Sequence, residues 1–100
     1  AMPHVRVRIP NRQLLERFFN TDLPAGGIFL RTPDLHPEGT AVWCDIVHPE
    51  TGQVFELEAK IAQVVPAPVR DRGMKLAIDA AEEMEALRVF VYGAAPTTEL

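Results

Sequence analysis

A short segment that begins with an acidic residue and contains a proline and two glycines offers binding chemistry. Asp22 is followed by Pro24, and Gly26 and Gly27 lead directly into the apolar stretch 28–30. Glycine adopts positive φ angles and β-bulges without a side-chain penalty, so the backbone here can approach another group closely. An acidic side chain just before such a turn usually accepts hydrogen bonds from local backbone N–H groups. The segment therefore indicates a binding turn rather than an acid or base for catalysis.

Positive charge is concentrated in the same third of the chain. The net charge of −4 argues against general nucleic-acid binding, but residues 1–32 contain five arginines and two acids, a local charge of +3. The five are Arg6, Arg8, Arg12, Arg17 and Arg31. They would attract an anionic ligand or an acidic protein surface, which makes Arg6 and Arg17 candidates for partner contact. The alternative is that the arginines only line the solvent face of a strand and a short helix.

The residues that usually carry catalysis or metal binding are scarce or badly spaced. The chain contains no serine, and Cys44 alternates with apolar residues, which predicts a core position rather than an activated thiol. The histidines show no metal-ligand spacing to one another or to Cys44; they are His4, His36 and His48. We therefore expect no catalytic residue, no bound metal and no cofactor, and the chain is not predicted to be an enzyme.

Length and composition favour one compact domain. A chain of 100 residues with 47% apolar content can bury a single core, which we place at residues 3–93, with 94–100 as a flexible tail. No apolar run is long enough to span a membrane, and the start of the chain lacks the apolar core of a signal peptide. A single cysteine cannot form an internal disulfide, which agrees with a reducing, cytoplasmic location.

The pattern of apolar residues predicts strands followed by a helix. Alternation indicates strands near residues 5–9, 27–31, 41–47, 55–65 and 74–78. Asn11 can cap a short helix near 11–20. A second helix near 80–92 is predicted to start with a capping box at Asp79–Glu82 and to stop at Gly93. The short connections then predict a mainly β fold, an antiparallel barrel whose C-terminal helix closes one end.

Trp43 and Val47 share the face of their strand that lies opposite the apolar residues 42, 44 and 46. If only one face of this strand is buried, the tryptophan and the valine are at the surface and mark a centre for partner binding. The alternative is that the C-terminal helix or the segment 11–20 covers them, because large aromatic residues are mostly buried.

The turn described above resembles part of the ligand site of PilZ domains, the bacterial receptors for cyclic di-GMP. One half of that site is a D/N-x-S-x-x-G motif at the head of a strand, and Asp22, Pro24 and Gly27 stand at its three fixed positions, with proline in place of serine. The resemblance extends from about Val5 to Tyr92 through the order of strands and terminal helix. It implies a PilZ-like β-barrel from a bacterial regulatory protein in cyclic di-GMP signalling or motility.

The second half of the PilZ site is an R-x-x-x-R pair that usually stands well ahead of the acidic turn. Arg8 and Arg12 have this spacing, but only nine residues separate Arg12 from Asp22. The main hypothesis is therefore a degenerate domain that binds a protein partner and has lost cyclic di-GMP binding. The alternative is a competent receptor whose ligand, cyclic di-GMP, is bound by Arg8, Arg12, Asp22 and Gly27.

Overall fold

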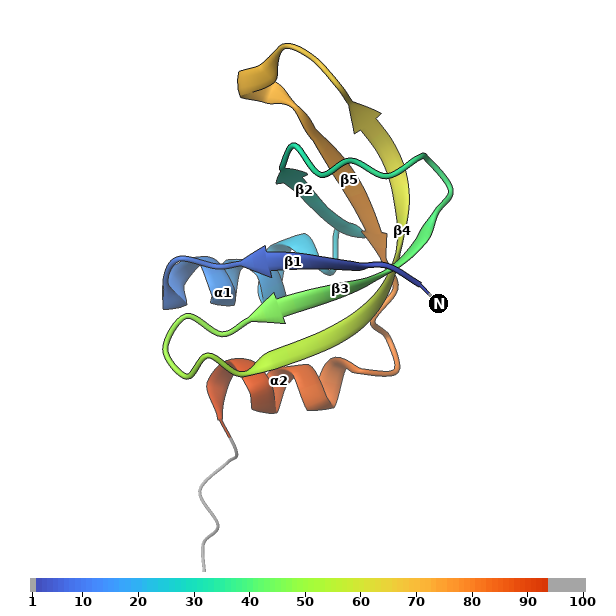
Figure 1. Cartoon of the computed structure of the whole chain (residues 1–100). Helices are drawn as coiled ribbons and strands as arrows, with labels where there is room; N and C mark the ends of the chain where they lie inside the picture. Colours follow the sequence, from blue (N-terminus) through green and yellow to red (C-terminus); the bar gives the residue numbers. More distant parts are fainter. Residues whose placement is uncertain (1, 94–100) are drawn as a thin grey trace, which may run out of the picture.

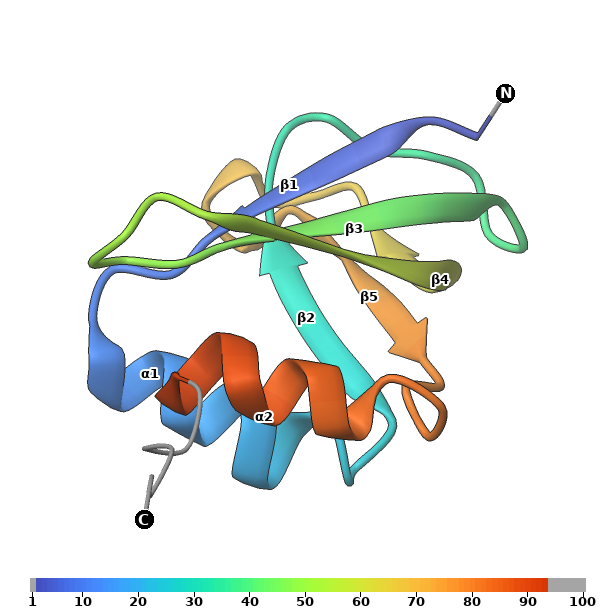
Figure 2. The same ribbon diagram turned by 90° about the horizontal axis from the view of Figure 1, so that it is seen from below.

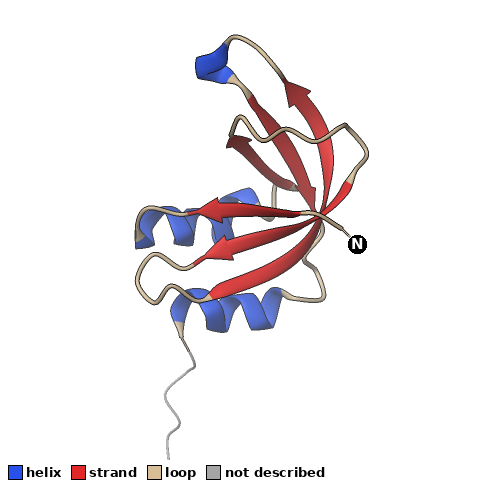
Figure 3. Cartoon of the chain, in the orientation of Figure 1, coloured by secondary structure: helices blue, strands red, loops and turns tan. Residues whose placement is uncertain are grey.

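The structure, a computed structural model, describes residues 2–93 and is mainly β (Figures 1 and 3). Its strands are β1 (His4–Arg8), β2 (Gly27–Arg31), β3 (Ala41–Val47), β4 (Val54–Val65) and β5 (Gly73–Ile78). Its helices are α1 (Arg12–Arg17), the π-helical turn η1 (Phe18–Asp22), the 3-10 turn η2 (Val69–Asp71) and α2 (Met84–Tyr92). The segment 94–100, predicted to be a tail, lies outside the described residues. All five predicted strands and both predicted helices are present.

The five strands form one sheet in the order β1-β3-β4-β5-β2, which bends into a half-barrel (Figure 1). Three of the four strand pairs are antiparallel, but β1 runs parallel to β3, with Val5 opposite Cys44. The prediction of an antiparallel sheet is therefore wrong at this pair. Short connections force β3–β4 and β4–β5 to be antiparallel, whereas α1, η1 and β2 separate β1 from β3 and permit either direction. The sheet also ends at β1 and β2, so it is mixed and open rather than a closed antiparallel barrel.

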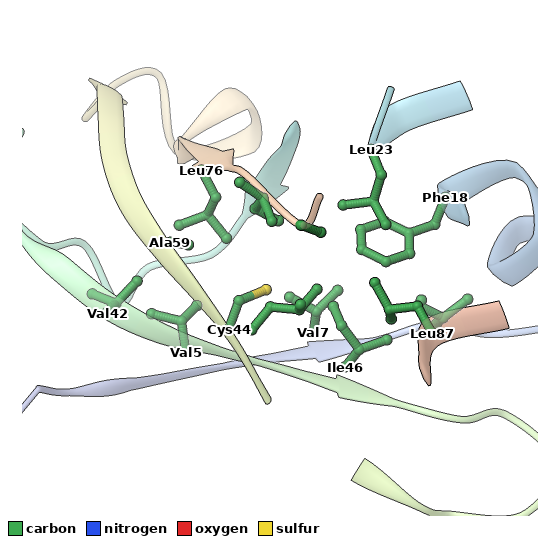
Figure 4. Close-up of a cluster of buried hydrophobic side chains, with 14 of the residues drawn as sticks. Val5, Val7, Phe18, Leu23, Val42, Cys44, Ile46, Ala59, Leu76 and Leu87 are labelled. Carbon is green, nitrogen blue, oxygen red and sulfur yellow. The ribbon is translucent and has the colours of Figure 1, made fainter. Parts of the chain in front are cut away.

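The concave face of the half-barrel contains the hydrophobic core. Inward side chains of β1, β3 and β5, such as Val7, Ile46 and Leu76, meet Phe18 and Leu87 from the helical segments (Figure 4). In Figure 2, α1 with η1 and α2 lie beneath this face of the sheet. Asn20 Nδ2 donates to the Tyr92 hydroxyl over 2.7 Å, which joins η1 to the end of α2. The helical layer therefore covers the face that alternation along the strands makes apolar.

The first helical segment begins as predicted and ends in a widened turn. The Asn11 side chain accepts a hydrogen bond of 2.9 Å from the Leu14 N–H, which confirms the predicted cap. At the other end the Leu23 N–H donates to the Phe18 carbonyl over 2.9 Å, a bond that spans five residues. Both Phe18 and Leu23 thereby reach the core, and Asp22 is left half-buried between them.

The C-terminal helix starts later than the capping box predicted. Asp79 Oδ1 accepts a bond from the Ala81 N–H at 3.2 Å, and the Glu83 N–H donates to the Ala80 carbonyl at 3.0 Å, so a turn precedes the helix. Ala80 is buried, which holds this segment against the core before the helix can begin at Met84. The predicted stop at Gly93 is confirmed, with φ of 83°. No helix in residues 2–93 is both long enough and apolar enough to cross a membrane.

The double glycine is required for two different reasons. Gly26 has φ of 106° in open space, whereas Gly27 has φ of 151° and a Cβ there would overlap the Leu76 carbonyl oxygen. Gly27 lies opposite Ala77 in the β2–β5 ladder, and the Gly26 carbonyl accepts from the Ile78 N–H at 2.8 Å. Glycine at position 26 thus permits a positive φ in the turn, and glycine at position 27 permits close contact between β2 and β5.

Substitution of each glycine by alanine should distinguish the cost of a positive φ from the cost of a steric collision. Gly26→Ala should lower the free energy of unfolding by about 1–3 kcal/mol, the usual cost of a positive φ at a residue with a side chain. Gly27→Ala should lose at least about 2 kcal/mol more, or fail to fold, because it adds a collision with the Leu76 backbone. Urea denaturation of both variants provides the measurement. Equal losses would show that β2 does not lie against β5 as described.

Because Cys44 is buried in the core, we expect the free energy of unfolding to depend on pH in the alkaline range. Burial raises the pKa of the Cys44 thiol from 9.0 to about 12, and the neighbouring Asp45 charge adds to the shift. Because the folded state then holds the thiol proton more tightly than the unfolded chain, the contribution to stability is complete below about pH 9. It is lost as pH rises toward the folded pKa, by up to about 1.4 kcal/mol per pH unit.

Denaturation between pH 8 and pH 11 tests this dependence. The wild-type protein should lose more stability over this range than Cys44→Ala, in which the thiol is absent. The native protein should also resist a thiol reagent at pH 8 and react with it once unfolded in urea. Rapid reaction of the native thiol, or parallel pH profiles of the two proteins, would contradict the buried position.

Candidate binding groove

A groove of about 430 Å³ lies where the ends of the two outermost strands approach the first helical segment. β1 and β2 are the end strands of the sheet, so each has one edge without a strand partner. We call this hollow the edge groove, and its lining residues are Val7–Pro10, Leu14, Arg17, Phe18, Asp22 and Gly27–Leu30. It therefore combines residues from β1, α1, η1 and β2.

The edge groove brings together three of the four residues predicted to bind cyclic di-GMP and one arginine predicted to contact a partner. Arg8 from β1 and Arg17 from α1 line it together with Asp22 and Gly27. Both arginines are exposed, and neither makes an ion pair within 4.0 Å among residues 2–93. Their guanidinium groups are thus available to a carboxylate or a phosphate, which they can bind with two hydrogen bonds.

Apolar side chains line the same groove beside these charges. Phe29 is 46% exposed and Leu14 is 41% exposed, so two large apolar side chains of the groove lining are accessible to solvent. Exposed apolar surface next to arginine is typical of the centres of protein interfaces. The sequence did not select these two residues, because Phe29 lies in an apolar run and Leu14 has the spacing of a core residue. In the structure Leu14 lies on α1, and the Phe29 ring lies against Gly73 of β5, where a Cβ would come within 2.9 Å of it.

Arg12 lies elsewhere and has a structural role. Its guanidinium donates to Glu50 Oε1 at 3.0 Å from Nε and 2.7 Å from Nη2, and Nη1 donates to the Val91 carbonyl at 3.0 Å. The hydrogen bond from Arg12 lowers the pKa of the Glu50 carboxyl, and the same bond raises the pKa of Arg12. Arg12 thereby joins the start of α1 to the β3–β4 hairpin and to the end of α2. It is not among the residues that line the edge groove with Arg8.

The other predicted partner residues lie on the outer face of the sheet. Trp43 and Val47 are half-buried there, and the helical layer covers the opposite face (Figure 2). Arg6 lies next to them on β1, opposite Asp45 of β3. Trp43 and Val47 therefore form a second candidate contact surface.

The residues considered for metal binding are dispersed, with one exception. His48 is buried, and its Nδ1 accepts from the N–H groups of Glu50 and Thr51 at 3.1 and 3.3 Å, which stabilises the hairpin turn. Cys44 lies in the core. His4 does gather with two carboxylates, Asp45 and Glu56, on the outer face. Local spacing could not reveal this group, because its members come from β1, β3 and β4 and are brought together only by the strand register.

A second hollow, of about 470 Å³, has the opposite charge. Glu58, Asp79, Glu82 and Glu83 line it with Lys60 as its only basic residue. An acidic ligand would be repelled from this surface. Arg31 lines a smaller hollow of about 180 Å³ with Arg70 and Arg72, so the positive charge of residues 1–32 is divided between that hollow and the larger edge groove.

A comparison of the chain with protein-family models and with curated protein sequences finds no match.

Proposed function

We propose that this chain is a non-catalytic, PilZ-like signalling domain of a bacterial regulatory protein, and that it binds a protein partner through the edge groove. The observation that carries the proposal is the groove itself, with two arginines that make no ion pair within residues 2–93 and two exposed apolar side chains, beside the free edges of β1 and β2. The partner class that fits is an extended, acidic segment of protein. Carboxylates would meet Arg8 and Arg17, and aliphatic side chains would meet Phe29 and Leu14.

Strand addition is the mode that such a groove favours. A free strand edge presents unpaired backbone N–H and carbonyl groups, which an extended peptide can satisfy. Side chains of an added strand alternate between two faces, so acidic and aliphatic residues should alternate in the bound segment. The Asp22 carboxylate, which also lines the groove, would repel an acid placed beside it, and this helps to set the direction of the peptide.

Charge reversal in the groove provides the first test. Arg8→Glu and Arg17→Glu should each weaken binding of a labelled ten-residue peptide with alternating Glu and Leu by about 10-fold or more, because each removes a charge-assisted hydrogen bond. Fluorescence anisotropy at moderate salt gives the affinities. Arg70→Glu is the matched control, since it makes the same charge change at an exposed residue outside the edge groove.

The melting temperatures of Arg8→Glu, Arg17→Glu and Arg70→Glu should stay close to that of the wild type, because all three positions are exposed. If Arg70→Glu weakens binding as much as the two groove variants, the effect is general electrostatics and the edge groove is not the site. If no acidic peptide binds while Trp43→Ala abolishes binding of an identified partner, the outer face is the interface.

The alternative function, reception of cyclic di-GMP, is favoured by one observation. Arg8, Asp22 and Gly27, three of the four residues assigned to that ligand, line the same groove. The fourth, Arg12, is bonded to Glu50 and to the Val91 carbonyl instead. Pro24 also removes the hydroxyl that the PilZ motif supplies. These two departures support loss of the ligand rather than its retention.

Calorimetric titration with cyclic di-GMP distinguishes the two functions. We expect no saturable binding below about 100 μM, because each charge-assisted bond that the split arginine pair cannot make is worth about 1.5–3 kcal/mol. A low-micromolar dissociation constant that disappears in Arg8→Ala would instead establish the receptor function. Arg17→Ala should be measured in parallel, since Arg17 is the second arginine that lines the groove.

A further inference from the structure

Three side chains that commonly bind metals meet on the outer face of the sheet, one from each of three neighbouring strands. His4 Nδ1 lies 3.0 Å from Asp45 Oδ2 and 3.7 Å from Glu56 Oε2. One ligand atom from each residue lies within 4.8 Å of the other two. Two ligands around a tetrahedral Zn²⁺ are about 3.4 Å apart, given a metal–ligand distance of about 2.1 Å. The two separations from His4 bracket this value, so little movement is needed to enclose a small cation.

The buried carboxylate of Asp45 is the group that a bound cation would neutralise. Its side chain is only 9% exposed although it lies on the outer face, and both carboxylate oxygens face His4 Nδ1 at 3.0 and 3.1 Å. Within the described residues, His4 is its only side-chain hydrogen-bond partner. A carboxylate removed from water needs a compensating charge. Arg6, opposite Asp45 in the sheet, is exposed and makes no ion pair within 4.0 Å in residues 2–93.

We propose that His4, Asp45 and Glu56 bind a divalent cation of the zinc type, with water in the remaining coordination position. An imidazole nitrogen together with carboxylate oxygens suits Zn²⁺ and its transition-metal neighbours, whereas Mg²⁺ and Ca²⁺ prefer oxygen ligands alone. The ligands come from a hydrogen-bonded sheet, in which Asp45 lies opposite Glu56, so their backbones are already positioned. The bound ion would join the edge strand β1 to β3 and β4.

This site is independent of the proposed function, but it shares strand β1 with the edge groove. β1 carries His4 at its first residue and Arg8 at its last, and Arg8 lines the edge groove. A cation at His4 therefore stabilises the strand that forms one side of the groove. Occupancy should raise the melting temperature, because an ion that binds only the folded state stabilises it by an amount that grows with the logarithm of the ion concentration above the dissociation constant.

Trp43 supplies the probe for an experiment. It is the only tryptophan in the chain, and it lies opposite His4 in the β1–β3 ladder. Co²⁺ should quench its emission saturably, and Zn²⁺ should reverse the quenching by competition, whereas Ca²⁺ and Mg²⁺ at the same concentration should not. His4→Ala and Glu56→Gln should each weaken the apparent affinity by at least about 10-fold. Both positions are exposed, so these variants should fold, as the melting temperature without metal will show.

Glu58→Gln is the matched control, because Glu58 lies opposite Trp43 on the same face of β4 and is outside the three-residue group. It should bind Co²⁺ with nearly wild-type affinity, and at the same concentration Zn²⁺ should raise the melting temperature of this variant more than that of Glu56→Gln. The proposal is overturned if quenching does not saturate below about 1 mM Co²⁺. It is also overturned if Glu56→Gln binds as tightly as the wild type, since His4 alone or another part of the chain would then hold the ion.

Discussion

The concave face of the half-barrel must be covered, and most of the structure depends on this requirement. Five strands bend around an apolar face but do not close, so the inward side chains would meet water without the helical layer. Leu15, Phe18, Leu87 and Val91 complete the core from that layer, and each is buried. Burial of a large apolar side chain contributes about 1.5–3 kcal/mol, so this layer stabilises the open sheet. Arg12 adds polar contacts that hold its two helices and the hairpin together.

An open sheet also explains why binding surfaces occur where they do. The helices cover one face, which leaves the two end strands and the outer face available to solvent (Figures 1 and 2). At the edge groove, the closure that a complete barrel would make is missing, and arginines stand beside exposed apolar side chains. On the outer face, the register of β1, β3 and β4 sets His4, Asp45 and Glu56 side by side. Incomplete closure therefore explains the edge groove, whereas strand register explains the group on the outer face.

Much of the fold could be predicted from local signals in the chain. Alternation located the strands because one face of each packs toward the core, although in β2 that face is only partly buried. The types of Asn11 and Gly93 predicted helix boundaries, because asparagine caps a helix start and glycine tolerates the positive φ of a helix end. The prediction failed at the direction of β1, since alternation specifies which face is buried and not which neighbour a strand joins. It failed again at Asp79, where burial of Ala80 delays the helix beyond a sequence with the form of a capping box.

The candidate site shows the same division between local and tertiary information. The sequence by itself determined that positive charge and a glycine turn lie in one third of the chain, because these properties belong to the residues and their immediate neighbours. The tertiary structure alone decided that Arg8 and Arg17 line one groove while Arg12 bonds Glu50. It alone placed His4 beside carboxylates about forty and fifty residues away. The physical reason is that strand pairing and helix packing set long-range neighbours, and hydrophobic burial drives both without reference to the polar side chains that they bring together.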